Sequence, residues 1–303
     1  MSDVQFLNED CANVFSKSAK LEKVESGFTF TEGPIWHPTE HWIMFSDIAE
    51  STQYKWSEAS GLEIFRKPTN QANGNCFDQM GRVVTCEHAS SQVTRHDHNG
   101  KLISVLASHY KGKELNSPND VVCDNQGRIW FTDPSFGRIQ EPLGILRDQE
   151  LDFMGVFRLD PDGMLTVVVD DFVQPNGLCL SLDQSQLYVN DSRGNPCIRR
   201  FDITQDGMLT NDTLFCDIGK DGIYVPDGMK MADNGYIICN GWKGILIINP
   251  QGEIVGRIDM PEKSTNFCFG GPERDWLYIT ASSTLYRIKT ATTGAPMIPV
   301  TTQ

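Results

Sequence analysis

The sequence has no long apolar run and few basic residues. Without a stretch of about 18 apolar residues it predicts no membrane span, and Met1–Asp10 lack the basic start and apolar run of a secretory signal. Lys and Arg number 26 against 40 Asp and Glu, for a formal net charge of −14. Because nucleic-acid binding needs clustered basic side chains, we expect neither a nucleic-acid partner nor a membrane partner. The expected partner is a small-molecule substrate, and nothing indicates a homo-oligomer.

Several catalytic motifs are also missing. There is no Gly-x-Ser-x-Gly elbow, no Gly-rich phosphate loop and no Cys/His cluster, which argues against a covalent hydrolase, a nucleotide enzyme and a structural zinc site. The nine cysteines are odd in number and form no Cys-x-x-Cys pair, and several lie in apolar runs. We therefore expect buried, reduced thiols that act as small apolar residues. Reduced thiols and no secretory signal favour a cytoplasmic location.

What the sequence does have is a repeated phrase before strand-like stretches. The four clearest copies are Glu32-Gly33-Pro34, Pro118-Asn119-Asp120, Pro175-Asn176-Gly177 and Pro226-Asp227-Gly228, and weaker copies lie at Asn73 and Asn266. The copies recur at intervals of 39 to 57 residues, and a blade of four short strands needs about 40 to 45 residues. The pattern predicts an all-β fold, a six-bladed β-propeller with four-stranded antiparallel blades, as a single domain over residues 1–303. A two-sheet sandwich is the alternative fold.

Three further segments have expected roles in this ring. Residues 1–20 form an N-terminal extension in which a short helix is expected within Cys11–Lys20. Leu21–Glu25 supply an outer strand to the last blade, because this covers an open edge and closes the ring. Residues 135–154 form an insertion rich in Gly, Pro and charged residues, which is expected to be a functional surface loop that covers the tunnel.

The residue types of the repeated phrase indicate a metal site. The six positions hold Glu32, Asn73, Asn119, Asn176, Asp227 and Asn266, and each precedes a strand that should line the central tunnel. Carboxylate and amide oxygens without His or Cys suit a hard divalent cation such as Ca²⁺. The alternative is that these residues only form turns, which applies best to Asn73 and Asn266.

The same phrases carry a family resemblance. Gly27–Trp36, Ser117–Asp120, Trp130–Pro134, Pro175–Leu178 and Pro226–Gly228 are similar to signatures of the SMP-30/gluconolactonase/luciferin-regenerating-enzyme family, over roughly Phe28 to Lys289. The resemblance implies a six-bladed propeller with one catalytic divalent ion, commonly Ca²⁺ or Zn²⁺. It implies that Glu32, Asn176 and Asp227 are metal ligands and that Asn119 lies near the ion and the substrate. Members of the family hydrolyse sugar lactones, and relatives cleave organophosphates.

One departure from the family pattern affects specificity. Ser117 stands where the animal members have an Arg that touches the sugar, so substrate contacts cannot be carried over.

These observations together predict a metal-dependent hydrolase that opens a sugar lactone. One divalent ion, Ca²⁺ first with Zn²⁺, Mg²⁺ or Mn²⁺ as alternatives, would polarise the carbonyl. Asp227 would be both metal ligand and general base, Asn119 would orient the substrate or stabilise the oxyanion, and Glu32 and Asn176 would hold the ion. The alternatives are a phosphotriesterase-like hydrolase at the same ion and a non-enzymatic ligand-binding propeller.

Other residues are candidates for the walls of the site. His88, which follows a predicted inner strand, and Asp120, which follows Asn119, are expected to support substrate binding. For His88, local hydrogen bonding is the alternative. Three aromatic residues are candidate pocket walls or packing residues, and two Asp residues at strand ends either support the site or turn the chain: Phe136, Tyr224, Trp242, Asp133 and Asp191.

Overall fold

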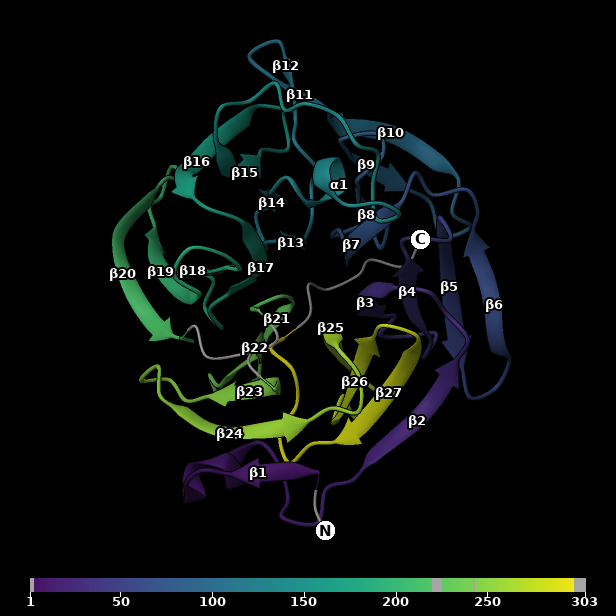
Figure 1. Cartoon of the computed structure of the whole chain (residues 1–303), viewed down its shortest axis with the longest axis vertical. Helices are drawn as coiled ribbons and strands as arrows, with labels where there is room; N and C mark the ends of the chain where they lie inside the picture. The colour runs from purple at the N-terminus through teal and green to yellow at the C-terminus, as the bar shows by residue number, and fades with distance from the viewer. Residues whose placement is uncertain (1–2, 220–224, 242, 297–303) are drawn as a thin grey trace.

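Six blades surround a central tunnel. The computed structural model describes residues 3–219, 225–241 and 243–296, and within these ranges the strands form six antiparallel sheets around one axis and a separate small hairpin (Figure 1). In the first four blades, four strands follow one another in chain order from the tunnel outward. The last two blades each include a strand from the N-terminal segment. The predicted fold class, a six-bladed β-propeller with four-stranded antiparallel blades, is confirmed.

The strands of the first three blades and the hairpin have the following bounds. Blade one contains β3 (Thr31–Trp36), β4 (Ile43–Asp47), β5 (Thr52–Ser57) and β6 (Gly61–Arg66). Blade two contains β7 (Ala72–Phe77), β8 (Val83–Glu87), β9 (Gln92–His96) and β10 (Leu102–Ala107). The hairpin pairs β11 (His109–Tyr110) with β12 (Lys113–Glu114), and blade three contains β13 (Val121–Cys123), β14 (Ile129–Asp133), β15 (Met154–Leu159) and β16 (Leu165–Phe172).

The last three blades follow the same order. Blade four contains β17 (Pro175–Leu180), β18 (Gln186–Asp191), β19 (Cys197–Ile203) and β20 (Leu209–Asp217). Blade five contains β21 (Met229–Met231), β22 (Ile237–Gly241), β23 (Gly244–Ile248) and β24 (Ile254–Asp259). Blade six contains β25 (Ser264–Gly270), β26 (Trp276–Ala281) and β27 (Thr284–Lys289).

The N-terminal segment completes two blades. Strand β2 (Leu21–Ser26) pairs antiparallel with β27 and is the outer strand of blade six, so the predicted ring closure by Leu21–Glu25 is confirmed. Strand β1 (Val4–Phe6) pairs with β24 and gives blade five a fifth strand, which the sequence did not predict. Both strands cover edges that would otherwise be open for pairing with another chain.

Helices are short. The helix expected within Cys11–Lys20 is instead a 3₁₀ turn, η1 (Glu9–Asn13), which begins earlier and is capped by the Asn8 side chain on the Asp10 N–H at 2.9 Å. It ends at Asn13 because the next two residues, Val14 and Phe15, are buried in the core between blades five and six. The insertion contributes α1 (Phe136–Ile139). Within the described ranges, no helix has the length and hydropathy that a membrane span requires.

The core is divided among the blade interfaces. In the described part of the chain, six clusters of buried apolar side chains each join two neighbouring blades, rather than forming one central core. Between blades six and one, for example, Trp36 stacks on Tyr278 with ring centroids 5.4 Å apart. Because each interface is apolar, each blade holds its neighbours at a fixed angle, and the innermost strands are left around a tunnel.

In blades two and three, an Asp-x-x-Gly segment forms the hairpin turn between the innermost strand and the second strand. The Oδ1 atom of Asp78 accepts the N–H groups of Met80 and Arg82 at 2.9 and 3.0 Å, and Gly81 takes a φ of 72° that favours glycine. Asp124 and Gly127 repeat this arrangement in blade three. The Asp side chain closes each of these two turns, and the glycine adopts a left-handed backbone conformation. The turns thereby fix the register between the innermost and second strands of blades two and three.

The cysteines are buried thiols. All nine are free, and eight of them are buried. Burial raises the pKa of Cys179 and of Cys268 to about 12, so both stay protonated and behave as small apolar side chains. The prediction of reduced, buried cysteines is confirmed.

Candidate functional site

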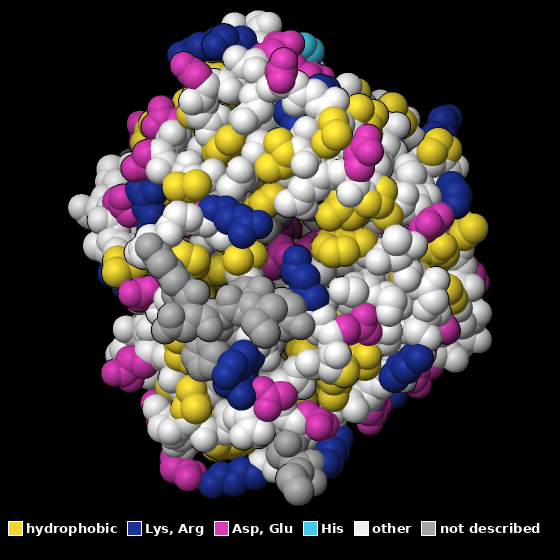
Figure 2. All heavy atoms as spheres, in the orientation of Figure 1, with side chains coloured by type: hydrophobic (Ala, Val, Ile, Leu, Met, Phe, Trp, Pro, Cys, Tyr) yellow, Lys and Arg dark blue, Asp and Glu magenta, His cyan; other side chains and the backbone are white. Residues whose placement is uncertain are grey.

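Five of the six phrase residues meet at one end of the tunnel. Glu32, Asn73, Asn119, Asn176 and Asp227, each at the start of the innermost strand of its blade, line one pocket of about 140 Å³. Figure 2 looks onto this end, where Asp and Glu side chains are visible inside a central hollow with Lys or Arg side chains beside it. The expected convergence of these residues on one end of the tunnel is therefore observed for all but Asn266.

The glycine in each phrase allows neighbouring inner strands to approach closely. A Cβ atom at Gly177 would lie 2.2 Å from the carbonyl oxygen of Asp227, and one at Gly33 would lie 2.1 Å from that of Asn73. The N–H of Gly177 donates to the Asp227 carbonyl at 3.1 Å. Gly33 and Gly177 lie within inner strands, where the requirement for glycine is close backbone approach between blades.

A ring of hydrogen bonds fixes the backbone of the pocket residues. A polar side chain near the end of the second strand of one blade donates to a carbonyl in the next blade's phrase: Ser46 to Asn73 at 2.9 Å, Thr132 to Asn176 at 2.8 Å and Asn190 to Asp227 at 2.6 Å. These donors are buried, where a satisfied hydrogen bond holds geometry strongly. The pocket side chains are thus presented by a fixed backbone.

Asp227 lies beside both Asn176 and Glu32 in this pocket, close enough for its carboxyl group to interact with their side chains. Burial raises the pKa of Asp227 to about 6, with Asp120 adding to the rise and Lys263 opposing it. Burial, then the charges of Asp227 and Asp120, hold the pKa of Glu32 well above its usual range. Two carboxyls that are buried side by side, and whose pKa values are both raised, form a site that favours a cation.

Asn266 and Asp120 lie beside Glu32 in the tunnel. The Asn266 amide donates to Glu32 Oε2 at 3.1 Å and to Asp120 Oδ2 at 3.4 Å, and Lys230 Nζ donates to Asn266 Oδ1 at 3.1 Å. The ammonium of Lys230 is 3.6 Å from Asp120. The turn-forming alternative for Asn266 is therefore wrong: it lies within β25 and bridges two carboxylates across the tunnel. Neither Asp120 nor Asn266 lines the pocket, so the structure does not place Asp120 against a substrate.

His88 faces the pocket from a different strand than expected. It follows β8, the second strand of blade two rather than the innermost one, and it returns to the pocket because β8 runs antiparallel to β7. Its Nδ1–H donates to the Leu143 carbonyl at 2.8 Å, and its Nε2 accepts from the Asn73 amide at 3.0 Å. Burial lowers the pKa of His88 to about 4, so the ring is neutral and orients Asn73 in the pocket. Turn formation is likewise not the role of Asn73.

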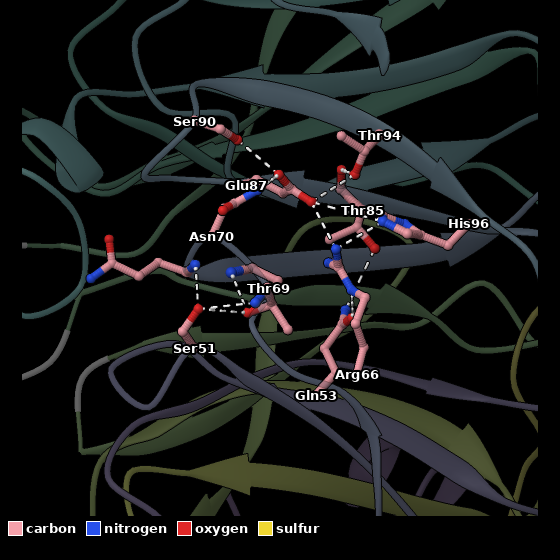
Figure 3. Close-up of polar contacts among 12 residues, drawn as sticks. Ser51, Gln53, Arg66, Thr69, Asn70, Thr85, Glu87, Ser90, Thr94 and His96 are labelled. Atoms are coloured by element: carbon pink, nitrogen blue, oxygen red, sulfur yellow. Dashed lines mark hydrogen bonds and ion pairs between the residues drawn. The ribbon is translucent and has the colours of Figure 1, made fainter. Parts of the chain in front are cut away.

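A buried polar network supports the turn that carries His88. Figure 3 shows Arg66, Asn70, Ser90 and Thr94 directed at the Glu87 carboxylate, with distances of 2.8 to 3.1 Å. Glu87 is 1 % exposed, and a buried carboxylate with this many donors has a fixed position. The residue that follows it, His88, is held in place as a result.

The insertion covers one side of the pocket. Phe136, Gln140 and Leu143 line it, as expected for a segment that covers the tunnel. Arg138 anchors the insertion: it is 2 % exposed and donates to the carbonyls of Asn116 at 2.7 Å and Leu115 at 2.6 Å, and it pairs with Glu114.

Ser117 has a structural role in this segment. Its Oγ donates to the Pro134 carbonyl at 2.6 Å and accepts the Gly137 N–H at 2.9 Å. It is fully buried, so it positions the insertion and does not line the pocket.

The remaining sequence candidates are supports or lie elsewhere. Asp191 accepts the N–H groups of Val173 and Gln174 at 2.8 and 2.9 Å, and Asp133 accepts that of Asn116 at 2.8 Å. Both end second strands, not inner strands, and hold the backbone that leads into the pocket phrases. Tyr224 and Trp242 lie outside the described residues.

Sequence reasoning missed several pocket residues. Phe30, Ile48, Arg193, Val225 and Lys263 also line the pocket. These residues lie in connecting loops, whose sequences do not repeat from blade to blade. The only available signal is that Phe30 and Val225 come just before a copy of the repeated phrase.

The donor set fits a hard divalent cation. Glu32, Asn176 and Asp227 offer two carboxylates and an amide, all oxygen ligands that suit Ca²⁺. Among the described residues, no three His, Cys, Asp or Glu side chains converge on a common metal position, so the third protein ligand would have to be the amide. In the same part of the chain, the buried Oδ1 atom of Asn73 has no hydrogen-bond partner, and it adds one more free oxygen at the pocket.

Comparison with known proteins places this architecture in a family. The chain is 31% identical to the gluconolactonase of Zymomonas mobilis over 93% of its own length and 84% of that protein. It is 25% identical to pentonolactonase XacC of Haloferax volcanii, over 90% of this chain and 95% of that protein. The structure of XC5397, described as a gluconolactonase from Xanthomonas campestris, aligns with a TM-score of 0.88 at 31% identity, covering 95% of this chain and 94% of that one.

The family assignment rests on most of the chain. Residues 30–283 match the SMP-30/gluconolactonase/LRE-like region, a span that includes every pocket residue described above. This protein therefore belongs to the SMP-30/gluconolactonase/LRE-like family.

Proposed function

We propose that this protein is a sugar lactonase that depends on one divalent cation bound by Glu32, Asn176 and Asp227. The observation that carries the proposal is the position of these three side chains in one pocket, with Asp227 beside both Glu32 and Asn176. The named activities of the relatives from Zymomonas mobilis and Haloferax volcanii support an aldonolactone as the substrate.

The cation would supply Lewis-acid polarisation of the lactone carbonyl oxygen. Ca²⁺ is our first choice because all the protein ligands are oxygens, with Zn²⁺, Mg²⁺ or Mn²⁺ as alternatives.

Asp227 is the proposed general base. One carboxylate oxygen can hold the cation while the other accepts a proton from a water molecule, whose oxygen then attacks the lactone carbonyl carbon. Collapse of the tetrahedral intermediate breaks the ring C–O bond, and the ring oxygen takes up a proton. Lys263, whose Nζ is 3.8 Å from Asp227 Oδ2, favours the ionised form of the base.

Asn119 is the proposed donor to the developing oxyanion. Its backbone is fixed on both sides, since its N–H donates to Thr132 at 2.8 Å and its carbonyl accepts from Gly74 at 2.9 Å. Its side chain lines the pocket, where an amide N–H can stabilise charge that grows in the transition state. Asn73, whose Oδ1 atom has no hydrogen-bond partner among the described residues, would contact the sugar hydroxyl groups. His88 would orient Asn73 through its Nε2 atom, with Asp120 in support through Asn266.

An add-back assay tests the proposal. Chelator-treated protein is assayed on glucono-1,5-lactone, a five-carbon aldonolactone and a phosphotriester, with Ca²⁺, Zn²⁺, Mg²⁺ or Mn²⁺ restored. We expect lactone hydrolysis that returns with a divalent ion, and loss of about 10²-fold or more in Asp227→Asn. The control is Asp162→Asn, at an exposed turn of blade three, which should keep full activity.

Other outcomes separate the alternatives. Faster turnover of the phosphotriester would favour the phosphotriesterase alternative. A folded protein that binds no divalent ion in calorimetry and hydrolyses no lactone would favour a non-enzymatic propeller. Full activity in Asp227→Asn would remove this residue from the mechanism.

A further inference from the structure

The rim of the pocket is chemically asymmetric. Phe30, Ile48, Phe136 and Leu143 form an apolar wall contributed by blade one and the insertion. Arg193 and Lys263 line the pocket from blades four and six. The repeated phrase alone would place similar residues all around the pocket. The difference between the apolar wall and the two cations can therefore orient a substrate.

The two cations lie on either side of Asp227 in the order of the blades. Arg193 follows β18 in blade four, Asp227 precedes β21 in blade five, and Lys263 precedes β25 in blade six. The N–H of Arg193 donates to Asp191 Oδ1 at 3.1 Å, which fixes the start of its loop. Lys263 also lies over the Phe30 ring, with Nζ 5.3 Å from the centroid. Both cations are therefore placed at the pocket by local contacts.

Arg193 is available for an anion. Within the part of the chain that the structure describes, no carboxylate or carbonyl pairs with its guanidinium, and the side chain is exposed. Arg199, in the same blade, instead pairs with both Asp171 and Asp212. The protein has 40 acidic and 26 basic residues, so acidic partners for an arginine are plentiful. Arg193 differs from Arg199 in having no such partner among the described residues. A guanidinium group is suited to bind a carboxylate or a phosphate.

The charges at the site lead to the same conclusion. Two carboxylates, Glu32 and Asp227, and two cations, Arg193 and Lys263, line the pocket. With the proposed divalent cation in addition, these groups would carry a net positive charge in a protein whose formal net charge is −14. A neutral lactone gains little from such a local field, whereas an anionic substrate is attracted by it.

Resting on the proposed lactone hydrolysis, we propose that the preferred substrate is an aldonolactone with an anionic group at the end of the chain remote from the lactone carbonyl. Arg193 binds that group and Lys263 adds to the local positive field. A carboxylate, phosphate or sulfonate shares the required chemistry. The apolar wall offers no charged partner to an anion, so the anion fixes which end of the substrate lies against Arg193.

The experiment compares kcat/KM on three lactones. Glucono-1,5-lactone is neutral, glucaro-1,4-lactone carries a carboxylate and 6-phosphoglucono-1,5-lactone carries a phosphate. We expect at least one acidic lactone to be preferred over the neutral one, and raised salt to reduce only the acidic rates. Arg193→Gln should lower kcat/KM for the acidic lactone by about 10- to 100-fold, the range of a lost charge-assisted hydrogen bond, and should lower kcat/KM for the neutral lactone by a smaller factor.

Two control variants and a binding measurement accompany this. Arg193→Lys keeps the charge and should retain part of the preference, while Arg199→Gln changes the net charge equally and should leave it intact. Calorimetry should show that glucarate, a dianion, binds more tightly than gluconate and that Arg193→Gln removes the difference.

The outcomes separate this inference from the proposed function. Hydrolysis of all three lactones at similar rates, or an equal effect of Arg193→Gln on all three, would overturn the anionic preference and leave the lactonase proposal standing. Absence of hydrolysis of any lactone with every divalent ion would overturn both.

Discussion

The two ends of the tunnel differ in chemistry although the same strands build them. At one end lies the pocket of about 140 Å³ lined by carboxylates and amides. At the other lies a larger pocket of about 230 Å³, lined mainly by apolar and thiol side chains that include Trp36, Phe77, Cys179 and Phe269. In β3 and β7 the polar phrase residue, Glu32 or Asn73, lies second in the strand, and the last residue, Trp36 or Phe77, is aromatic.

The larger cavity and the residues that we propose for catalysis therefore lie at opposite ends of the tunnel. The larger pocket offers volume and apolar surface, but catalysis requires donors and acceptors that are held in position. Those donors occur where the inner strands start, because there the backbone of each phrase is fixed by a side chain of the preceding blade. We expect substitutions at the two ends to have different consequences.

The largest expected effect is from Glu32→Gln at the polar end. Loss of one buried carboxylate should lower lactone kcat/KM and divalent-ion affinity by about 10²-fold or more, measured by pH-stat assay and calorimetry. Glu63→Gln, on the outer strand of the same blade, is the matched control and should leave both unchanged. Normal ion affinity in Glu32→Gln would contradict its assignment as a ligand.

Gly177→Ala should both destabilise the protein and damage the site. The new Cβ would lie 2.2 Å from the Asp227 carbonyl oxygen and 2.9 Å from Asn190 Nδ2, which forces blades four and five apart at a proposed ligand. We expect a loss of about 2 to 4 kcal/mol in the free energy of unfolding and a large drop in activity. Gly163→Ala, at an exposed turn with no neighbour within 4 Å, should cost about 1 kcal/mol through its backbone strain and leave activity intact.

The pH dependence of stability should report on His88. Its pKa is lowered to about 4 in the folded protein, from about 6.5 in the unfolded chain. Its contribution to stability is therefore complete above pH 6.5 and is lost as the pH falls toward 4, by up to about 1.4 kcal/mol per pH unit. The stability gap between wild type and His88→Gln, measured by urea unfolding, should shrink over this window. A gap that is constant with pH would contradict a neutral, buried ring.

The smallest effect is expected at the apolar end. Cys179→Ala removes a buried thiol from the larger pocket and should cost about 1 kcal/mol of stability, with lactone kcat/KM within about twofold of wild type. A tenfold loss of activity would show that the two ends are coupled, and would weaken the distinction drawn between them.

Much of the fold was predictable because each blade repeats one local pattern. The phrase, the apolar strand and the D-x-x-G turn are all encoded within a few residues, so the innermost strands, their turns and the closing strand β2 could be placed from the sequence. Glu32, Asn119, Asn176 and Asp227 were located together because the circular arrangement turns equal sequence positions into neighbours in space. Their roles at a metal ion remain predictions.

What could not be predicted depends on contacts between blades. Asn266 has the sequence context of a turn residue, yet it bridges Glu32 and Asp120 across the tunnel. His88 was predicted to follow an inner strand, but it follows β8, the second strand of blade two, which runs antiparallel to β7. Strand β1 has only three residues, and no sequence pattern indicates its pairing with β24. Arg193 and Lys263 lie in loops that contain no part of the repeated phrase.

Closure of the ring by the N-terminal strand has a consequence for biosynthesis. Blade six takes β2 from the beginning of the chain and β25 from near its end, and the Thr265 hydroxyl donates to the Thr31 carbonyl at 2.7 Å beside the Asn266–Glu32 contact. Because the first and last blades meet beside a proposed ligand, a ribosome must deliver almost the entire polypeptide before Glu32 acquires its neighbours. A nascent chain that lacks its final hairpins should therefore carry no working centre, however well its earlier blades have folded.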